Sequence, residues 1–403
     1  MGQSTFPVPS SGSSTSTVLP VNASSVILDG SLTSAGTYTT TVNGNGGIAY
    51  LTATDNPATI TVSGTAYSVP ANTVVASKAF GASTSVTVAA PYTGVPSSFT
   101  ASTMPTNGSS NGWGTIIYGN NLFISIAGSI SASTYGAYSS NGSTWSSMTM
   151  PSSSLWTGVA YGNGYFVAVA YGTTAGAYST NGTTWTASTM PSSSAWTGVT
   201  YGNGYFVAVQ ESGTTAGAYS TNGTTWTAST MPSSKYWTGV TYGNGYFVAV
   251  QGSSSTAGAY STNGTTWTAS TMPSSSAWTG VTYGNGYFVA VQGSGTTAGA
   301  YSTNGTTWTA STMPSSSNWY GVTYGNGYFV AVAVGTTAGA YSTNGTTWTA
   351  STLPSSSSWL GVAYGNGYFV AVQGSGTTNG AYFAQSALMP VNFGIYAGPT
   401  TIN

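Results

Sequence analysis

Short apolar segments recur along most of the chain, and each is followed by a polar turn sequence. From Trp196 one unit reads "WTGVTY", Asn-Gly, "YFVAV", "AGAYS", Asn-Gly and "TTWTAST". Gly, Thr and Val dominate and no apolar spacing of 3.6 residues persists, which excludes helices. Asn-Gly pairs are typical of tight hairpin turns, so each unit is predicted to form four antiparallel strands. The second strand, "YFVAV", is apolar on both faces and is expected to be buried between neighbouring units.

A Trp-x-Gly motif marks each unit and lies 40 or 41 residues from the next. A more divergent copy, "WGTIIYGNNLFISIAG", begins at Trp113 and brings the number of units to seven. A period near 40 with four strands per unit is the signature of a β-propeller blade. The predicted fold class is therefore all-β, a seven-bladed β-propeller of four-stranded blades. The six regular motifs begin at Trp156, Trp196, Trp237, Trp278, Trp319 and Trp359.

The last unit indicates how the ring closes. It lacks the fourth strand, whereas "FTASTMP" at 99–105 is a fourth strand without a unit of its own. We expect 94–106 to complete the last blade, because a closed ring leaves no sheet edge exposed. The alternative closing strand is "VNFGIY" at 391–396. The propeller is thus assigned to 94–384, and 385–403 is assigned to a C-terminal tail.

Two further segments precede the propeller. Residues 25–93 hold short strand candidates between turn sequences, such as "GTYTTTV" and "ATITVSG", which predicts a small β-sandwich-like module. Residues 1–24 are rich in Ser, Thr and Pro and predict an extended arm. A free polar terminus does not order itself, so the arm is expected either to anchor the chain to a larger assembly or to fold back on the module. The expected anchor contacts are Phe6, Pro7, Val8, Val18 and Leu19.

Charge is almost absent from the 403 residues, which contain no Arg, His or Cys. Two lysines cannot neutralise a nucleic-acid backbone, so no nucleic-acid partner is expected. The longest apolar runs are too short to span a bilayer, so no membrane insertion is expected either. The first residues show no secretory signal pattern. The five charged residues are Asp29, Asp55, Lys78, Glu211 and Lys235.

This composition also leaves little material for catalysis. Glycoside hydrolysis uses two carboxyl groups, and the predicted propeller contains only Glu211. Nucleophilic triads need a base such as His, and metal sites need His, Cys or clustered carboxylates. Only a weak Ca²⁺ site built from carbonyl oxygens remains conceivable. We therefore expect no enzyme activity, no catalytic residues, no cofactor and no metal.

The turn sequence "YSTNGTTW" resembles the Asp-box, or BNR, repeat of sialidase-type propellers. Ser179, Asn181, Gly182, Thr184 and Trp185 match that pattern, with Asn in place of Asp. The resemblance implies a structural turn and says nothing about activity. Sialidases of this family need an arginine cluster that this chain lacks, so their activity is not carried over. The layout of arm, β module and near-identical repeats also resembles bacteriophage virion proteins. Further Asp-box-like copies end at Trp145, Trp226, Trp267, Trp308 and Trp348.

Differences between the repeats fall in the loop from the second to the third strand and in the loop that enters the next unit. In an up-and-down blade these two loops lie on the same side, so the variation gathers on one rim. Loops on a rigid scaffold commonly carry binding residues, although drift in unconstrained loops gives the same pattern. Repeated Trp and Tyr residues are expected mainly to pack in the core. The candidate ligand-binding residues are Leu155, Trp156, Tyr171, Gln210, Glu211, Lys235, Tyr236, Gln251, Gln292, Asn318, Tyr320, Leu360 and Gln373.

These features predict a bacteriophage virion protein, located on the particle exterior, whose propeller recognises a host-surface receptor. A neutral glycan is the expected receptor, because Tyr, Trp, Gln, Asn and Ser suit sugar rings and hydroxyls. Other virion proteins are the expected partners of the arm and module. Two alternatives remain open: a capsid or tail decoration or fibre protein without a ligand, and a secreted microbial adhesin located outside the cell.

Overall fold

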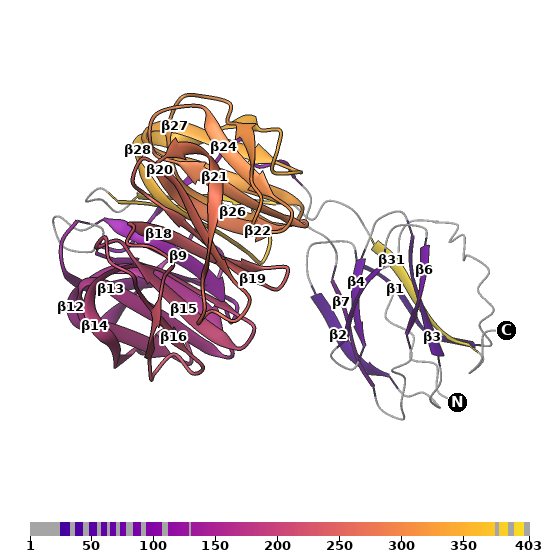
Figure 1. Ribbon diagram of the computed structural model, residues 1–403. Helices are drawn as coiled ribbons and strands as arrows, with labels where there is room; N and C mark the ends of the chain where they lie inside the picture. The colour runs from indigo at the N-terminus through magenta and orange to yellow at the C-terminus, as the bar shows by residue number, and fades with distance from the viewer. Residues whose placement is uncertain are drawn as a thin grey trace. The chain divides into compact units, whose positions relative to one another are not determined.

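The computed structural model describes residues 25–398 except 33–36, 43–47, 55–57, 63–64, 70–72, 78–83, 90–93, 107–111, 129, 375–378 and 386–390. The arm at 1–24, with its five expected anchor residues, lies outside the described residues. All regular structure in the described part is β-strand, and it contains no helix long and apolar enough to cross a membrane. The chain divides into two compact units, Met1–Val95 with Gln385–Asn403 and Pro96–Ala384 (Figure 1).

The first unit contains two four-stranded antiparallel sheets, ordered β1-β31-β3-β6 and β2-β7-β4-β5, as the predicted small sandwich requires. Leu51 in β3 and Ile60 and Val62 in β4 are buried. The strands are β1 (Ser25–Leu32), β2 (Thr37–Val42), β3 (Ile48–Thr54), β4 (Ala58–Val62), β5 (Thr65–Val69), β6 (Thr73–Ser77), β7 (Thr84–Ala89) and β31 (Val391–Gly398).

The position of β31 corrects the expectation of a C-terminal tail at 385–403. β31 lies between β1 and β3 and pairs with both along its length (Figure 1, yellow strand). The alternating residue pattern of "VNFGIY" is typical of a strand, and the two neighbouring strands provide its hydrogen bonds. Gln385 Nε2 also donates to the carbonyl oxygen of Gly94 at 3.0 Å, which joins the segment that leaves this unit to the one that returns. The propeller is therefore inserted between β7 and β31 of the first unit.

The second unit is the seven-bladed propeller, built from β8 to β30. Its strands are β8 (Thr100–Thr103), β9 (Trp113–Gly119), β10 (Leu122–Ala127), β11 (Ser133–Ser139), β12 (Ser146–Gly162), β13 (Tyr165–Ser179), β14 (Thr186–Gly202), β15 (Tyr205–Gln210), β16 (Ala216–Ser220), β17 (Thr227–Thr230), β18 (Trp237–Gly243), β19 (Tyr246–Gln251), β20 (Ser255–Ser261), β21 (Thr268–Ser276), β22 (Trp278–Gly284), β23 (Tyr287–Gln292), β24 (Ala298–Ser302), β25 (Thr309–Thr312), β26 (Asn318–Gly325), β27 (Tyr328–Ser342), β28 (Thr349–Gly365), β29 (Tyr368–Gln373) and β30 (Asn379–Ala384).

Each blade is an antiparallel sheet whose inner strand contains the Trp-x-Gly motif, or Trp113-Gly114 in the divergent first blade. The fourth blade, β18-β19-β20-β21, and the fifth, β22-β23-β24-β25, are separate sheets. Elsewhere one long strand belongs to two blades: β12, for example, pairs with β11 through Ser146–Thr149 and with β13 through Leu155–Gly162. The first strands of successive blades contact one another around the whole ring, including the last contact between β28 and β9. They form the wall of a central channel.

The ring closes with a strand from before the first blade. β8 pairs with β30, with Thr103 opposite Asn379 and Thr100 opposite Tyr382, and supplies the fourth strand of the seventh blade. Phe99 and Met104, which flank β8, are buried on either side of that blade. The alternative strand, β31, pairs within the first unit instead.

Neighbouring blades meet at a repeated glycine–tyrosine contact. A Cβ added to Gly202, which ends the first strand of its blade, would collide with the ring of Tyr242 in the next blade. The same arrangement recurs at every joint, and Gly365 against Tyr118 closes the ring. Only glycine leaves room for the ring to pack directly on the strand. The contact pairs are Gly119–Tyr161, Gly162–Tyr201, Gly202–Tyr242, Gly243–Tyr283, Gly284–Tyr324, Gly325–Tyr364 and Gly365–Tyr118.

The "YSTNGTTW" turn is held by side chains that bond its backbone. Asn181 Oδ1 accepts hydrogen bonds from the backbone N–H groups of Thr183 and Thr184, both at 2.9 Å. Ser179 Oγ accepts from the N–H of Gly182 at 2.8 Å, and the Trp185 indole donates to the Gly182 carbonyl at 3.2 Å. These contacts use one amide oxygen of Asn181, so asparagine can do here what an aspartate carboxylate does. The turn has a structural role.

Candidate functional site

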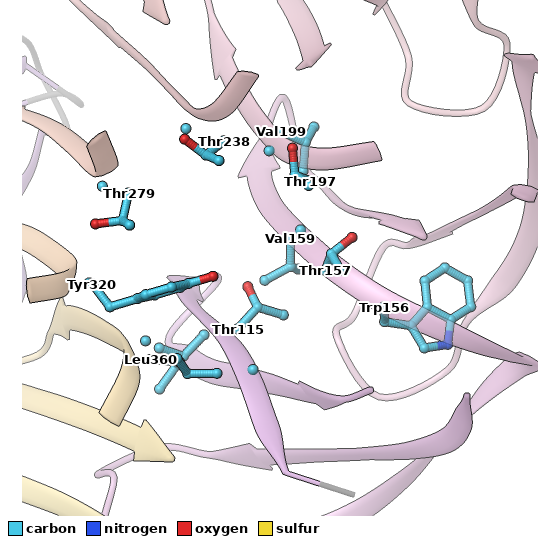
Figure 2. Close-up of a pocket in the computed structure, with 18 of the residues that line it drawn as sticks. Thr115, Trp156, Thr157, Val159, Thr197, Val199, Thr238, Thr279, Tyr320 and Leu360 are labelled. Atoms are coloured by element: carbon cyan, nitrogen blue, oxygen red, sulfur yellow. The ribbon is translucent and has the colours of Figure 1, made fainter. Parts of the chain in front are cut away.

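A cavity of about 470 Å³ lies at one end of the central channel and is lined by the first strands of all seven blades (Figure 2). It is the end at which those strands begin, so the loops entering each blade and the loops between second and third strands surround its mouth. This is the rim on which the repeats differ in sequence. Several departures from the repeat therefore lie around one cavity.

Two rings of side chains form the wall. The deeper ring is aliphatic and consists of Ile116, Val159, Val199, Val240, Val281, Val322 and Val362. The ring at the mouth lies one residue after each motif Trp and consists of Gly114, Thr157, Thr197, Thr238, Thr279, Tyr320 and Leu360. The site thus has an apolar floor and a largely polar entrance.

The threonines of the mouth ring also tie the blades together. Each hydroxyl donates to the carbonyl oxygen of the motif Trp in the next blade, at 2.5 to 2.7 Å. Leu360 has no hydroxyl, and Tyr320 carries its hydroxyl at the far end of a ring, so neither side chain can make this bond. One such bond contributes about 1 kcal/mol. The sixth and seventh blades therefore forgo a stabilising bond and place a large side chain in the cavity instead.

Two more large side chains enter the site from loops between second and third strands. Tyr171 and Glu211 line the cavity at the position that Gly252 and Gly293 occupy in the fourth and fifth blades. Leu155, in β12 just before the motif Trp of the second blade, lines it as well. Large residues thus come from the first, second, third, sixth and seventh blades, with Ile130 from the first, whereas the fourth and fifth contribute only Thr, Gly and Val.

Glu211 and Tyr320 interact electrostatically across this mouth. Burial raises the pKa of the Glu211 carboxyl above its ordinary value of 4.5. Burial also raises the pKa of the Tyr320 hydroxyl, and the negative charge of Glu211 raises it further. The Tyr320 ring extends into the cavity, with its hydroxyl turned away from its own strand (Figure 2). The carboxylate and the aromatic ring therefore face the same space.

The raised pKa of Glu211 predicts a pH-dependent gain in stability on its neutralisation. Burial makes the folded state favour the neutral carboxyl. The protein is therefore most stable with respect to this group below pH 4.5, and that stability is lost as the pH rises through the raised pKa of the folded state. Glu211→Gln should melt like the parent below pH 4.5 and slightly higher at neutral pH, by no more than about 2 °C. Thermal melts across that range test this. A variant that melts lower at neutral pH would instead show that the carboxylate has a stabilising partner.

The structure removes five of the predicted residues from the site. Trp156 is fully buried and its indole points away from the cavity, so only its backbone contributes to the lining (Figure 2). Its indole nitrogen donates to the carbonyl of Ser133 at 3.1 Å. Gln210, Gln251, Gln292 and Gln373 are also completely buried. A ligand arriving from solution cannot reach these side chains.

The glutamines instead organise the adjoining loops. Gln210 Nε2 donates to the carbonyl oxygen of Thr214 at 3.0 Å, and its Oε1 accepts from the Ser212 N–H. Where alanine replaces glutamine, at Ala170 and Ala333, the loop is one residue shorter and the strands continue as β13 and β27. Motif spacings of 41 and 40 residues therefore correspond to loops with and without the glutamine.

The other predicted residues divide into two groups. Leu155, Tyr171, Glu211, Tyr320 and Leu360 line the cavity together. Lys235 and Tyr236 lie on the loop entering the fourth blade, Asn318 is the first residue of β26 in the sixth, and none of the three lines the cavity. Tyr236 is half exposed and packs near Gly213, in the loop that carries Glu211.

Sequence reasoning missed several lining residues. Ile130 is 58% exposed at the mouth, and Thr115 lines the wall where other blades have glycine. Both belong to the divergent first repeat, and a comparison of only the regular repeats does not include them. The threonine ring was missed because it is repeated, and identity between copies indicated packing. No group of three or more acidic, His or Cys side chains that could bind a metal ion occurs among the described residues.

No protein-family model matches the chain, and no curated protein matches its sequence. Solved propellers share its fold. A catalytically inactive histidine-to-alanine variant of virginiamycin B lyase from Staphylococcus aureus, with quinupristin, aligns at a TM-score of 0.59 and 13% identity, over 74% of this chain and 99% of its own. YCF48 bound to D1 peptide aligns at a TM-score of 0.56 and 14% identity, over 73% of this chain and 97% of its own. The WD40 β-propeller domain of Doa1 aligns at a TM-score of 0.53 and 13% identity, over 71% of this chain and 97% of its own. At such identities these likenesses establish the β-propeller fold of residues 96–384 and nothing finer.

Proposed function

We propose that this protein is a bacteriophage virion component whose propeller recognises a glycan of the host surface through the channel mouth. One observation carries the binding role: most of the large residues that break the repeat, Leu155, Tyr171, Glu211, Tyr320 and Leu360, line a single cavity. Drift in unconstrained loops would also collect changes on this rim, but drift gives no reason to replace residues that stabilise the fold. Here Tyr320 and Leu360 also replace threonines that bond neighbouring blades, and a change that costs stability is expected where it serves a function.

The lining suits an uncharged, hydroxyl-rich ligand. Tyr171 and Tyr320 are 39% and 42% exposed, which leaves ring surface on which a sugar can pack. On the side of the cavity formed by the fourth and fifth blades, Gly239, Gly280 and the threonines beside them present backbone and hydroxyl groups. The propeller has two formally charged residues, Glu211 and Lys235, so acidic polymers find little attraction.

Two neighbours in fold were solved with ligands, quinupristin in one case and a D1 peptide in the other. They support a binding role for propellers of this shape, at identities that transfer no specificity. The lyase variant that is inactive has lost a histidine, and this chain contains no histidine. A binding function without catalysis is therefore the better match to the residues present.

The virion assignment has separate support. It rests on the polar arm at 1–24, on the inserted arrangement of the propeller within a small β module, and on the Asp-box-like turns. In this proposal the arm and module contact other virion proteins, and the propeller is displayed outward. Proteomics of purified particles tests it: detection of the chain in particles supports the virion role, and its recovery only as a free extracellular protein favours the secreted adhesin.

A glycan array probed with the full-length chain tests the binding role. Selective binding to a subset of glycans supports recognition, with uncharged or weakly charged glycans expected among the hits. Failure to bind any glycan, combined with presence in particles, supports the alternative of a decoration or fibre protein without a ligand.

The scarcity of charge predicts weak salt dependence. Affinity for a neutral glycan hit should change by less than about threefold between low and high salt, because few charges are available for screening. Titrations at several salt concentrations measure this slope. A steep loss of affinity with salt would contradict recognition of a neutral glycan and would indicate several ion pairs.

A further inference from the structure

Glu211 introduces an uncompensated negative charge into the cavity. It is the single acidic residue between 96 and 384, and its position in the fourth and fifth blades is occupied by glycine. Among the described residues its side chain has no ion-pair partner and no hydrogen bond. The nearest candidate counter-ion in sequence, Lys235, lies on a loop outside the cavity. A half-buried carboxylate without a partner is unfavourable for folding, so an incoming cation would gain from it.

Aromatic rings share the space with this carboxylate. Tyr320 lies close enough for the Glu211 charge to act on its hydroxyl, and Tyr171 extends from the loop of the blade next to that of Glu211. A cation over the face of such a ring is attracted by its quadrupole, by about 0.5–2 kcal/mol. A carboxylate together with aromatic faces is an arrangement that favours an organic ammonium ion over a neutral or acidic group.

We propose that the cavity selects a sugar with a free amino group, whose ammonium is held by Glu211 against the ring of Tyr320. The threonines and glycines of the fourth and fifth blades then face the remaining hydroxyls. This inference rests on the proposed function and changes its expected ligand from a neutral glycan to one that contains at least one sugar with a free amino group. N-acetylation would remove that charge and keep the sugar scaffold.

The test compares tetramers of glucosamine and N-acetylglucosamine by calorimetry with the full-length chain. The titrations are run at several pH values between about 5 and 7.5, because the preference requires both a protonated sugar amine and an ionised Glu211, whose pKa burial raises. We expect the glucosamine tetramer to bind at least tenfold more tightly. Glu211→Gln, which keeps the shape of the side chain, should abolish this preference. Asp29→Asn, which removes the same charge from β1 in the other unit, should leave it intact.

A second variant separates the ring from the hydroxyl of Tyr320. Tyr320→Phe should retain most of the preference, whereas Tyr320→Thr, the residue of four other blades, should weaken it severalfold. Equal binding of the two tetramers, unaffected by Glu211→Gln, would overturn the ammonium inference and leave glycan recognition standing. Absence of binding to either tetramer and to every glycan on the array would overturn both.

Discussion

Replacing Ser97–Met104 with a Gly/Ser segment of equal length should lower the melting temperature by about 10 °C or more and cause association. The replacement removes β8, so the seventh blade loses its fourth strand and β30 gains an exposed edge. Phe99 and Met104 also leave the core, and each large-to-small change of that kind costs about 2–5 kcal/mol. At about 2 °C per kcal/mol for a large domain, the loss reaches the stated shift.

Thermal melts and light scattering measure these effects. Met104→Leu is the matched control, because Leu353 occupies the corresponding buried position before β28 enters the seventh blade. That variant should melt close to the parent. If the Gly/Ser replacement melted like the parent and stayed monomeric, closure by β8 would be contradicted.

Gly284→Ala should destabilise the propeller by about 2–3 kcal/mol, a cost typical of overpacking in a dense core. The added methyl group would collide with the ring of Tyr324, which packs on this glycine from the next blade. Chemical denaturation measures the loss. Truncation of the ring in Gly284→Ala/Tyr324→Ala should cost less than the sum of the two single changes, because the clash is then absent.

Gly164→Ala provides the comparison for the glycine effect. Gly164 has a φ of +80° at a hairpin tip, and no atom lies within 4 Å of an added Cβ. Its substitution should therefore cost only about 1 kcal/mol, from the left-handed backbone alone. Equal losses at Gly284 and Gly164 would show that the tyrosine contact does not hold the blades together.

The repeat makes most of the propeller predictable from sequence. Trp-x-Gly sets the start of each blade, Asn-Gly sets its turns, and the apolar "YFVAV" segment forms the buried second strand. The Asn residues of the regular first turns, such as Asn163 and Asn203, have positive φ as a tight hairpin requires. Local signals repeated along a chain fix local structure well.

What sequence could not supply was the partner of a strand far along the chain. β31 has an alternating pattern, but nothing near it indicates pairing with β1 and β3 more than 300 residues earlier. The prediction that the glutamines bind a ligand was wrong for another reason. Gln210 stands beside a variable loop in sequence, yet its side chain folds inward to bond that loop. Position in a variable segment does not reveal the direction of a side chain.

The cavity was predictable from sequence only in part. Tyr320 and Leu360 were recognisable as departures from a threonine, and Tyr171 and Glu211 as departures from a smaller residue. That they line one cavity follows only from ring closure, which brings the second and third blades opposite the sixth and seventh. Their convergence is the property on which the proposed binding role depends.

Restoring the repeat at the mouth tests that role most directly. The triple variant Glu211→Gly, Tyr320→Thr and Leu360→Thr gives each position the residue that other blades carry, so it should fold and melt no lower than the parent. Its affinity for the strongest glycan hit of the full-length chain, measured by calorimetry, should fall at least a hundredfold, because the cavity then lacks the Glu211 carboxylate and the Tyr320 ring. A correctly folded triple variant that binds that glycan as tightly as the parent would contradict recognition at the channel mouth.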